Sequence, residues 1–292
     1  MSTNDCAGIP PHPTPLPAGE RGPVHPAVSE VREGQAALTS PRGGEVGPQG
    51  RVRGEDAETD RVPILSVSGV AKTFVLHLRE GARLPVVNGA GFELFAGECV
   101  ALGGPSGAGK SSLLKMVYGN YRVDAGAILV RDGAETVDVA RTSPRRLIRL
   151  REDTMGYVSQ FLRVIPRVGA LDVVAEPLIG DGVPREAAAA RAGELLARLN
   201  LPERLWSLPP ATFSGGEQQR VNIARGLIAH RPLLLMDEPT ASLDAANRQV
   251  VVGLIEEKKR AGVAILGIFH DTEVREAVCD RVIDVTDFAQ AA

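Results

Sequence analysis

The stretch Gly104-Pro105-Ser106-Gly107-Ala108-Gly109-Lys110-Ser111 determines the fold prediction, because it matches the pattern G-x-x-x-x-G-K-[ST] at every position. The apolar run Cys99-Val100-Ala101-Leu102 before it reads as a strand, and residues 112–118 after it continue as a helix. Glycines in such a loop let successive backbone N–H groups turn toward phosphate oxygens, and the helix N-terminus adds partial positive charge. The sequence therefore predicts a phosphate-binding loop in an α/β nucleotide-binding domain.

Individual roles follow from this loop. The Lys110 amino group should reach the β- and γ-phosphates of ATP, and the Ser111 hydroxyl should ligate Mg²⁺. ATP and Mg²⁺ are thus the expected cofactors. The predicted nucleotide contacts in this segment are Gly104, Pro105, Ser106, Gly107, Ala108, Gly109, Lys110, Ser111 and Ser112.

Two acidic residues, Asp237 and Glu238, follow the all-apolar run Leu233-Leu234-Leu235-Met236. Such a run suits a buried parallel strand, and ligands of open α/β sheets sit at the carboxyl ends of strands. Alone, an acidic pair after a strand is usually a solvated edge. Downstream of a phosphate-binding loop it indicates that Asp237 holds Mg²⁺ and that Glu238 acts as the general base on the attacking water.

Further segments indicate an α/β fold with a largely parallel sheet. Residues 64–67, 91–94 and 263–269 read as strands, and residues 185–199 read as a helix rich in Ala, Leu, Glu and Arg. The sequence Ser214-Gly215-Gly216-Glu217 has the S-x-x-E pattern of a helix capping box.

Taken together, these motifs resemble the ABC ATPase family across residues 63–287. Residues 213–220, Phe-Ser-Gly-Gly-Glu-Gln-Gln-Arg, look like its signature sequence, although Phe213 and Glu217 replace the usual Leu and the frequent Gln. The resemblance implies a P-loop NTPase with a mixed central sheet, an N-terminal antiparallel β subdomain, and a helical subdomain inserted at about 145–227 of a domain spanning 62–288. It further implies a dimer, because in this family the signature binds the γ-phosphate held by the partner's loop.

The same resemblance assigns roles to other residues. Gln160 looks like the Q-loop glutamine, expected to take part in catalysis and to ligate Mg²⁺, and His270 looks like the catalytic switch histidine. Phe74 resembles the aromatic residue that stacks on adenine. Ser214, Gly215, Gly216 and, in the D-loop 241–244, Asp244 are expected to contact nucleotide across the dimer.

Plainer interpretations remain open for some of these residues. Phe74 could instead belong to the core, with His77 as a competing ring, and His270 could merely cap a strand end. Gln160 could be an ordinary loop residue. Arg163 and Arg167 could contact a partner or form a solvated surface.

Composition sets outer limits on the function. The chain has 292 residues and a net charge of -3, and this charge does not indicate a nucleic-acid binder. Its three cysteines form no C-x-x-C pair, so neither a disulfide framework nor a zinc site is indicated. Free thiols fit a cytoplasmic location, and no apolar run reaches bilayer-spanning length, so direct membrane insertion is not expected. Residues 1–61 are rich in Pro and Gly and are predicted to be a disordered tail, with a docking tail and an upstream start codon as alternatives.

A closer resemblance concerns the pathway. Segments at 74–77, 83–86, 159–167, 202–206 and 267–271 look like the ABC-type subunit of the bacterial phosphonate C–P lyase system. This resemblance implies an ATPase that supports ribose 1-phosphonate 5-triphosphate formation, in a homodimer or a heterodimer with another ABC subunit, and associated with C–P lyase core subunits. Two alternatives stand beside it: the ATP-binding subunit of a membrane transporter of lipoprotein-release or export type, and a scaffold that uses ATP as a dimerisation clamp.

Overall fold

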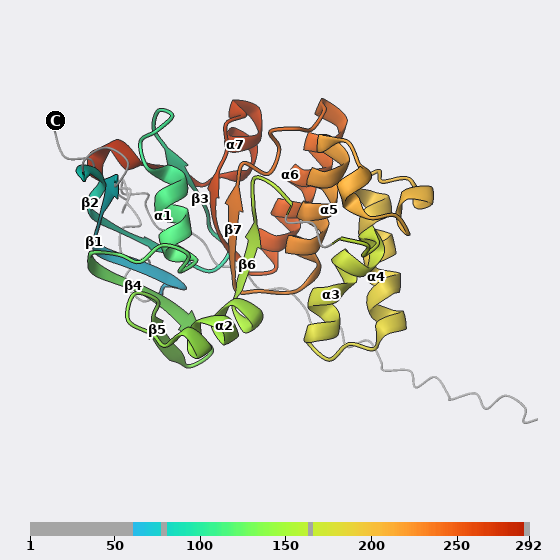
Figure 1. The fold of residues 1–292 in the computed structure, drawn as a ribbon, viewed down its shortest axis with the longest axis horizontal. Helices are drawn as coiled ribbons and strands as arrows, with labels where there is room; N and C mark the ends of the chain where they lie inside the picture. Colours follow the sequence, from blue (N-terminus) through green and yellow to red (C-terminus); the bar gives the residue numbers. More distant parts are fainter. Residues whose placement is uncertain (1–60, 77–80, 163–165, 289–292) are drawn as a thin grey trace, which may run out of the picture. The chain divides into compact units, whose positions relative to one another are not determined.

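Two β-sheets organise the part of the chain that this computed structural model describes, residues 61–76, 81–162 and 166–288 (Figure 1). The first sheet has four antiparallel strands in the order β2-β1-β4-β5. Pro85, which has no backbone N–H to donate, is tolerated in β2 because this strand lies at the edge of the sheet and pairs with one neighbour only. The bounds are β1 (Leu65–Leu76), β2 (Ala82–Leu94), β4 (Ala125–Asp132) and β5 (Glu135–Asp138).

The second sheet has five strands in the order β6-β7-β8-β3-β9, and its neighbouring strands are parallel. Strands β7 and β8 are buried at every residue, which explains their continuous apolar sequences. The edge strand β9 is far more exposed and correspondingly more polar. The bounds are β6 (Met155–Val158), β7 (Leu233–Asp237), β8 (Ala264–Ile268), β3 (Cys99–Gly103) and β9 (Arg281–Asp284).

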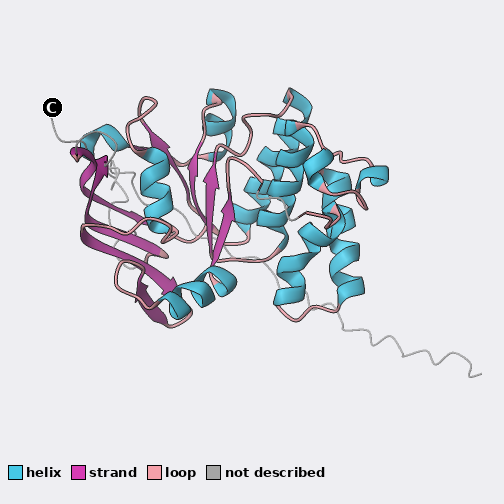
Figure 2. Cartoon of the chain, viewed as in Figure 1, coloured by secondary structure: helices cyan, strands magenta, loops and turns pink. Residues whose placement is uncertain are grey.

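Helices surround the second sheet, with α1 on the side of the four-stranded sheet and α3, α4 and α5 on the other (Figures 1 and 2). Side-chain caps begin several of them: Ser143 at α2, Ser214 at α5, Asp244 at α6 and Asp271 at α7. The helices are α1 (Lys110–Val117), α2 (Pro144–Asp153), α3 (Ala170–Gly180), α4 (Arg185–Arg198), α5 (Gly215–Ile228), α6 (Ala245–Arg260) and α7 (Thr272–Val278), with 3-10 turns η2 (Glu203–Leu205), η3 (Pro210–Thr212) and η4 (Val285–Phe288).

Helix α1 is central to the position of the site. Its buried side chains Leu113, Leu114, Met116 and Val117 belong to one apolar cluster that also contains residues of both sheets. A second cluster joins the opposite face of the parallel sheet to α3, α4, α5, α6 and α7. The loop that precedes α1 is therefore held at the junction of the two sheets by the apolar contacts of α1.

The predicted fold class is confirmed: the chain has an α/β P-loop architecture, with antiparallel and parallel pairs divided between the two sheets. The predicted helix at 185–199 corresponds to α4, and the predicted strands overlap β1, β2, β3, β7 and β8, with 64–67 and 263–269 extending one residue beyond the observed ends. The expected helical segment at 145–227 also contains β6, a strand of the parallel sheet. The domain limits stay a prediction, since residues 1–60 lie outside the described residues. No helix in the described ranges has the length and apolar character that a membrane crossing requires.

Candidate nucleotide-binding site

The phosphate-binding loop connects the end of β3 to the start of α1, as the sequence predicts. Gly104, Gly107 and Gly109 have φ values of +111°, +85° and +98°, a region that residues with a Cβ rarely adopt. At Gly109 a Cβ would also lie 2.9 Å from the carbonyl oxygen of Val86. The backbone conformation thus favours glycine at all three positions, and at Gly109 the close approach of β2 requires it as well.

The Lys110 side chain is buried and its amino group is held by the loop itself. Its Nζ donates to the carbonyl oxygens of Gly104 at 2.7 Å and Pro105 at 2.8 Å. The cation is therefore positioned inside the curve of the loop, where an anionic phosphate would replace carbonyl dipoles as its partner.

Ser111 and Asp237 meet across the gap between α1 and β7. The Ser111 hydroxyl donates to Asp237 Oδ1 at 3.2 Å, and the Tyr157 hydroxyl donates to Oδ2 at 3.4 Å. Burial raises the pKa of the Asp237 carboxyl above its ordinary value, although the Ser111 hydrogen bond partly opposes this. The nearby charge of Lys115 favours the ionised form of Asp237. A buried carboxylate in such surroundings is suited to bind a cation.

The Ser111 hydroxyl oxygen and the Asp237 carboxylate suit Mg²⁺. This cation takes hard oxygen ligands and usually binds through one or two carboxylates together with substrate phosphates. Among the residues that the structure describes, no group of three or more His, Cys, Asp or Glu side chains could hold a metal. The protein thus offers Mg²⁺ a partial ligand set that phosphate oxygens would complete.

Glu238 follows Asp237 in a left-handed backbone conformation, with φ +51°. Its carboxylate contacts His270 Nε2 at 2.9 Å through Oε1 and accepts from Gln160 Nε2 at 3.1 Å through Oε2. The backbone N–H of Glu238 donates to Ile268 O at 3.0 Å, so the strained residue is anchored to β8. A non-glycine residue in this conformation costs roughly 1–3 kcal/mol and is found mainly at functional sites. Glu238 therefore contacts the two other predicted catalytic residues, His270 and Gln160, while the catalytic roles of all three and the magnesium role of Gln160 stay predictions.

A cavity of about 440 Å³ extends from the loop toward the four-stranded sheet. Phe74 lines it, half-buried, with its ring edge-on to Tyr121 at 5.4 Å between centroids and the Lys72 amino group 5.4 Å from the ring. Leu84 and Val86 add apolar surface on the same side. The cavity-lining residues are Phe74, Leu84, Val86, Ser106, Gly107, Gly109, Lys110, Ser111, Ser112, Glu238 and His270.

Phe74 thus lies in the cavity where its predicted base-stacking role would require it, and this role stays a prediction, while the competing His77 lies outside the described residues. Leu84 and Val86 were missed as site residues. Their segment stands out in the sequence only as an insertion, and nothing local shows that β2 would fold back against the loop.

The predicted signature residues form a second group, separate from that cavity lining. Ser214 caps α5: it accepts from the Glu217 N–H, and Glu217 accepts from the Ser214 backbone and hydroxyl, at 2.8 and 2.7 Å. Those bonds, the Ser214 side chain first, hold the pKa of Glu217 below its ordinary value. The predicted capping box is therefore present.

The D-loop lies against the signature. A Cβ on Gly216 would come within 2.9 Å of the Ser242 carbonyl oxygen, so only glycine allows this contact. Asp244 caps α6 by accepting from the Asn247 N–H at 2.8 Å, and this bond lowers its pKa. Ser214, Gly215 and Asp244 are all exposed, so this second group is available to another molecule.

Comparisons with known proteins agree with this geometry. The ABC transporter family profile matches residues 87–241. The chain is 41% identical over 226 residues to the lipoprotein-releasing system ATP-binding protein LolD 2 of Caulobacter vibrioides, covering 77% of this chain and 95% of that protein. It is 36% identical to the probable export ATP-binding/permease protein MacB of Pseudomonas entomophila, covering 77% of this chain and 32% of that protein. Among solved structures, the dimeric ATP-binding cassette MJ0796 bound to ADP and Pi superposes with a TM-score of 0.69 at 27% identity, covering 76% of this chain and 95% of that one.

The predicted C–P lyase role is wrong, because the relatives with a stated role are ATP-binding proteins of lipoprotein-releasing systems and export ATP-binding/permease proteins. The error has a physical cause. Three of the five segments that favoured that pathway, 74–77, 83–86 and 267–271, contribute residues to the nucleotide cavity, and ATP imposes similar residues there whatever process its hydrolysis is coupled to. The dimer and ATPase parts of the prediction do not depend on that pathway. On its profile match and its extended identity to LolD, this chain belongs to the ABC transporter family, as an ATP-binding protein of that family.

Proposed function

We propose that this chain is the ATP-binding subunit of a membrane ABC transporter of the lipoprotein-release type, acting at the cytoplasmic face of the membrane. The observation that carries the proposal is the extent of the LolD match, which covers 95% of the length of that ATP-binding protein. A second such protein, LolD of Maricaulis maris, is 40% identical over 94% of its length. Release of lipoproteins is what the names of those relatives state, and the substrate of this chain is inferred from them.

Export of MacB type is the second candidate. The observation in its favour is 36% identity over 225 residues, but these residues make up only 32% of a longer ATP-binding/permease protein. The two candidates share the same ATPase chemistry and differ in what the membrane partner moves.

For catalysis, we infer the following roles. Mg-ATP, when bound, supplies the γ-phosphoryl group that is transferred to water. Lys110 and the loop N–H groups hold the phosphates, and Ser111 with Asp237 hold the metal. Glu238 accepts the proton of the attacking water, while Gln160 and His270, both hydrogen-bonded to it, orient its carboxylate.

The active unit is proposed to be a head-to-tail dimer. The loop group and the signature group are separate in one chain, and the signature group is exposed at the N-terminus of the 14-residue helix α5. Such a helix end attracts anions. A partner's signature placed over the γ-phosphate would give each nucleotide donors from two chains, and the similar cassette MJ0796 is itself described as dimeric.

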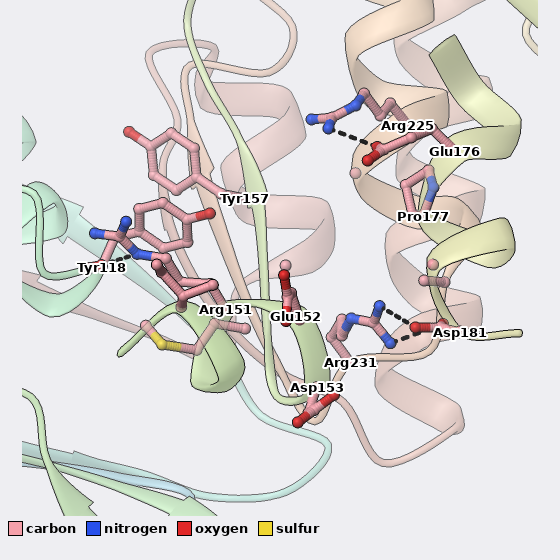
Figure 3. A pocket seen from close by; sticks show the side chains of 16 residues that line it. Tyr118, Arg151, Glu152, Asp153, Tyr157, Glu176, Pro177, Asp181, Arg225 and Arg231 are labelled. Carbon is pink, nitrogen blue, oxygen red and sulfur yellow. Dashed lines mark hydrogen bonds and ion pairs between the residues drawn. The ribbon is translucent and has the colours of Figure 1, made fainter. Parts of the chain in front are cut away.

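The docking surface proposed for the permease is a groove of about 710 Å³ bounded by α2, β6, α3 and α5. Figure 3 shows its two walls: Arg151 with Tyr118 and Tyr157 on one, and the ion pairs Arg225–Glu176 and Arg231–Asp181 on the other. Ile148 contributes an apolar side chain that is 54% exposed. Mixed charge around an exposed apolar residue suits a short amphipathic segment of a membrane protein.

This groove is connected to the catalytic residues through β6. Tyr157 stands in the groove and also donates to Asp237, and three residues later Gln160 donates to Glu238. Beyond β6, the Asn222 side chain of α5 holds the Ser159 carbonyl oxygen. A partner that displaces β6 would therefore move groups bound to both carboxylates.

The test is purification of the tagged chain from detergent-solubilised membranes of its source organism, with mass spectrometry of the proteins that accompany it. We expect an integral membrane permease, and its depletion together with this chain should leave lipoproteins in the membrane from which the permease was purified. Ile148→Asp should abolish the association without reducing ATP hydrolysis by the isolated chain. Val282→Asp is the matched control, because Val282 is 52% exposed on β9 at the opposite sheet edge. Recovery of no membrane protein, or equal loss in both variants, would contradict the proposal.

A further inference from the structure

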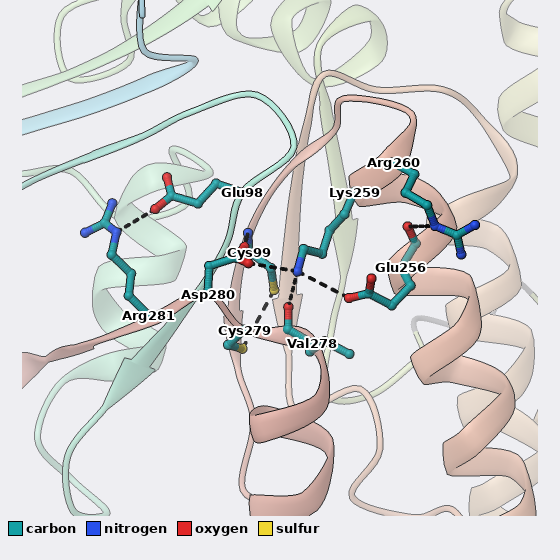
Figure 4. Close-up of polar contacts among 9 residues, drawn as sticks. All are labelled: Glu98, Cys99, Glu256, Lys259, Arg260, Val278, Cys279, Asp280 and Arg281. Carbon is teal, nitrogen blue, oxygen red and sulfur yellow. Dashed lines mark hydrogen bonds and ion pairs between the residues drawn. The ribbon is translucent and has the colours of Figure 1, made fainter. Parts of the chain in front are cut away.

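Two cysteines that are 180 positions apart in the sequence lie side by side. Cys99 begins β3 and is fully buried, and Cys279 follows the last turn of α7 and is partly exposed. Their Sγ atoms are 3.7 Å apart (Figure 4). Neither thiol belongs to the nucleotide site or to the groove described above.

The backbone on both sides fixes this proximity. The Cys99 N–H donates to Asp280 Oδ2 at 2.8 Å, and the Asp280 N–H donates to the Cys99 carbonyl oxygen at 2.8 Å. The ladder continues as β3 pairs with β9, with Val100 opposite Arg281. Both thiols are thus attached to backbone that the parallel sheet holds in register, and only a small side-chain movement separates them from the roughly 2.05 Å of an S–S bond.

The surroundings distinguish the two sulfurs. The Lys259 amino group lies beside them, bound to the Val278 carbonyl oxygen at 2.7 Å and to Asp280 Oδ1 at 3.1 Å. The hydrogen bond from Cys99, and then the Lys259 charge, lower the pKa of the Cys279 thiol. The same contact and burial raise the pKa of Cys99. Cys279 is consequently the exposed sulfur with the greater thiolate character, and the thiolate is the reactive form.

We propose that Cys99 and Cys279 form a redox modification site that a hydroperoxide converts to an intramolecular disulfide. The Cys279 thiolate attacks the terminal oxygen of the hydroperoxide, the O–O bond breaks, and the departing alkoxide or hydroxide takes a proton from solvent to become alcohol or water, which gives a sulfenic acid at Cys279. The Cys99 sulfur then attacks Cys279 Sγ, the S–O bond breaks, and water leaves with the Cys99 proton. Two thiols lose two electrons in total, and the hydroperoxide is reduced by the same two.

The modification would join two elements that lead into the nucleotide site. β3 continues directly into the phosphate-binding loop, and α7 begins two residues after His270. A disulfide here closes a loop of 180 positions, and long closed loops restrict the unfolded chain most. We therefore expect oxidation to raise the Tm of the chain by about 5–10 °C.

The experiment treats the folded full-length chain with hydrogen peroxide, blocks remaining thiols with N-ethylmaleimide, and maps peptides by mass spectrometry. The expected product is a peptide pair linking Cys99 to Cys279, reversed by dithiothreitol together with the Tm shift. Cys6→Ser is the matched control and should give the same product. In Cys99→Ala the sulfenic acid at Cys279 has no resolving thiol, so dimedone should label Cys279. In Cys279→Ala, dimedone should leave the buried Cys99 unlabelled.

Three results would overturn the proposal. The first is a linked peptide pair that forms only after unfolding in urea. The second is preferential linkage of Cys6 to either partner in the folded chain. The third is dimedone labelling of Cys99 in Cys279→Ala at the same rate as labelling of Cys279 in Cys99→Ala. Equal rates would mean that the exposed thiol does not react with the hydroperoxide faster than the buried one. Because Cys99 is buried as a small apolar side chain, alanine retains most of its packing, and circular dichroism checks that each variant is folded.

Discussion

Glu238 adopts a left-handed backbone conformation at the end of β7 and shares its two carboxylate oxygens between His270 and Gln160. Replacing it with Gln keeps the side-chain size but removes the basic oxygen. We expect ATP binding to be retained and hydrolysis to fall by about 10²–10⁴, the usual contribution of a general base. Nucleotide titration and phosphate release measure the two quantities.

Glu238→Asp provides the matched comparison. It retains the negative charge, but its shorter side chain places the carboxylate further from His270. Its rate should fall between those of the parent and of Glu238→Gln. A Glu238→Gln chain that hydrolyses ATP at the parent rate would remove Glu238 from the base role.

Asp237 illustrates a conflict between stability and function. Burial raises its pKa, so at neutral pH the folded chain carries a carboxylate in a less favourable environment than the unfolded chain does. Asp237→Asn should therefore increase the free energy of unfolding at pH 7 without Mg²⁺. The difference should shrink as pH falls toward 3.8, where Asp237 is increasingly protonated in the unfolded chain as well.

Urea unfolding of both chains across this pH range measures the effect, and added Mg-ATP should stabilise the parent more than the variant. A variant that is less stable at every pH would show that the Ser111 and Tyr157 hydrogen bonds outweigh the burial of the charge.

At single positions, motif chemistry predicts which side chains matter but not how they are held. Lys110, Ser111 and Asp237 follow from spacing because ATP and Mg²⁺ require those groups near one another. The left-handed φ of Glu238 could not be predicted, since it results from anchoring to Ile268 on a strand distant in sequence. The Cys99–Cys279 contact is likewise set by the pairing of β3 with β9.

Among the helices, α5 has the N-terminal cap on which the proposed second anion site depends. The Ser214 bonds lower the pKa of Glu217, so this carboxylate stabilises the folded chain above its ordinary pKa of 4.5, and the contribution is lost as pH falls below that value. In Glu217→Gln this part of the pH dependence should disappear. Thermal unfolding of both chains between pH 3 and 7 (roughly the range in which carboxylates titrate) provides the measurement.

Ser214→Ala is the companion change, and it should lower stability by about 1 kcal/mol because it removes the N-cap oxygen. Identical pH profiles for the parent and Glu217→Gln would mean that the capping box does not contribute to stability in solution.

Secondary structure was predictable where one local signal was strong. β7 and β8 were visible as continuous apolar runs, α4 as an alanine-rich helix and α5 from its capping box. β4 and β5 mix exposed and buried positions and β9 has no buried residue, all at or near sheet edges, so their sequences show no comparable pattern. Strand β6 is only four residues long, and its place in the sheet depends on pairing with β7.

For the molecule as a whole, the shared-site dimer can be tested by complementation. Ser214→Arg should reduce hydrolysis by at least about 10²–10³ while leaving nucleotide binding at its own loop. Lys110→Ala should lose binding at its own loop but keep an intact signature. Mixed dimers then contain one site with both halves intact, so an equal mixture should recover roughly one quarter of the parent activity.

Phosphate release from the two variants, separately and mixed, gives the measurement, and a mixture of Lys110→Ala with Glu238→Gln should stay inactive, because both changes lie in the loop half of the site. A mixture that stays inactive while the parent chain is active would contradict the shared site. So would an activity per chain that does not change with dilution down to a monomer shown by light scattering.

The strand order of the parallel sheet also bears on how the chain is made. β3, which leads into the phosphate-binding loop, lies between β8 and β9, more than 150 residues further along the chain. During synthesis the antiparallel pairs of β1, β2, β4 and β5 can form early, whereas β3 has no neighbours until the last strands leave the ribosome. A nascent chain therefore contains the complete phosphate-binding sequence long before it can bind ATP, and nucleotide capture reports that translation has reached the C-terminal strands.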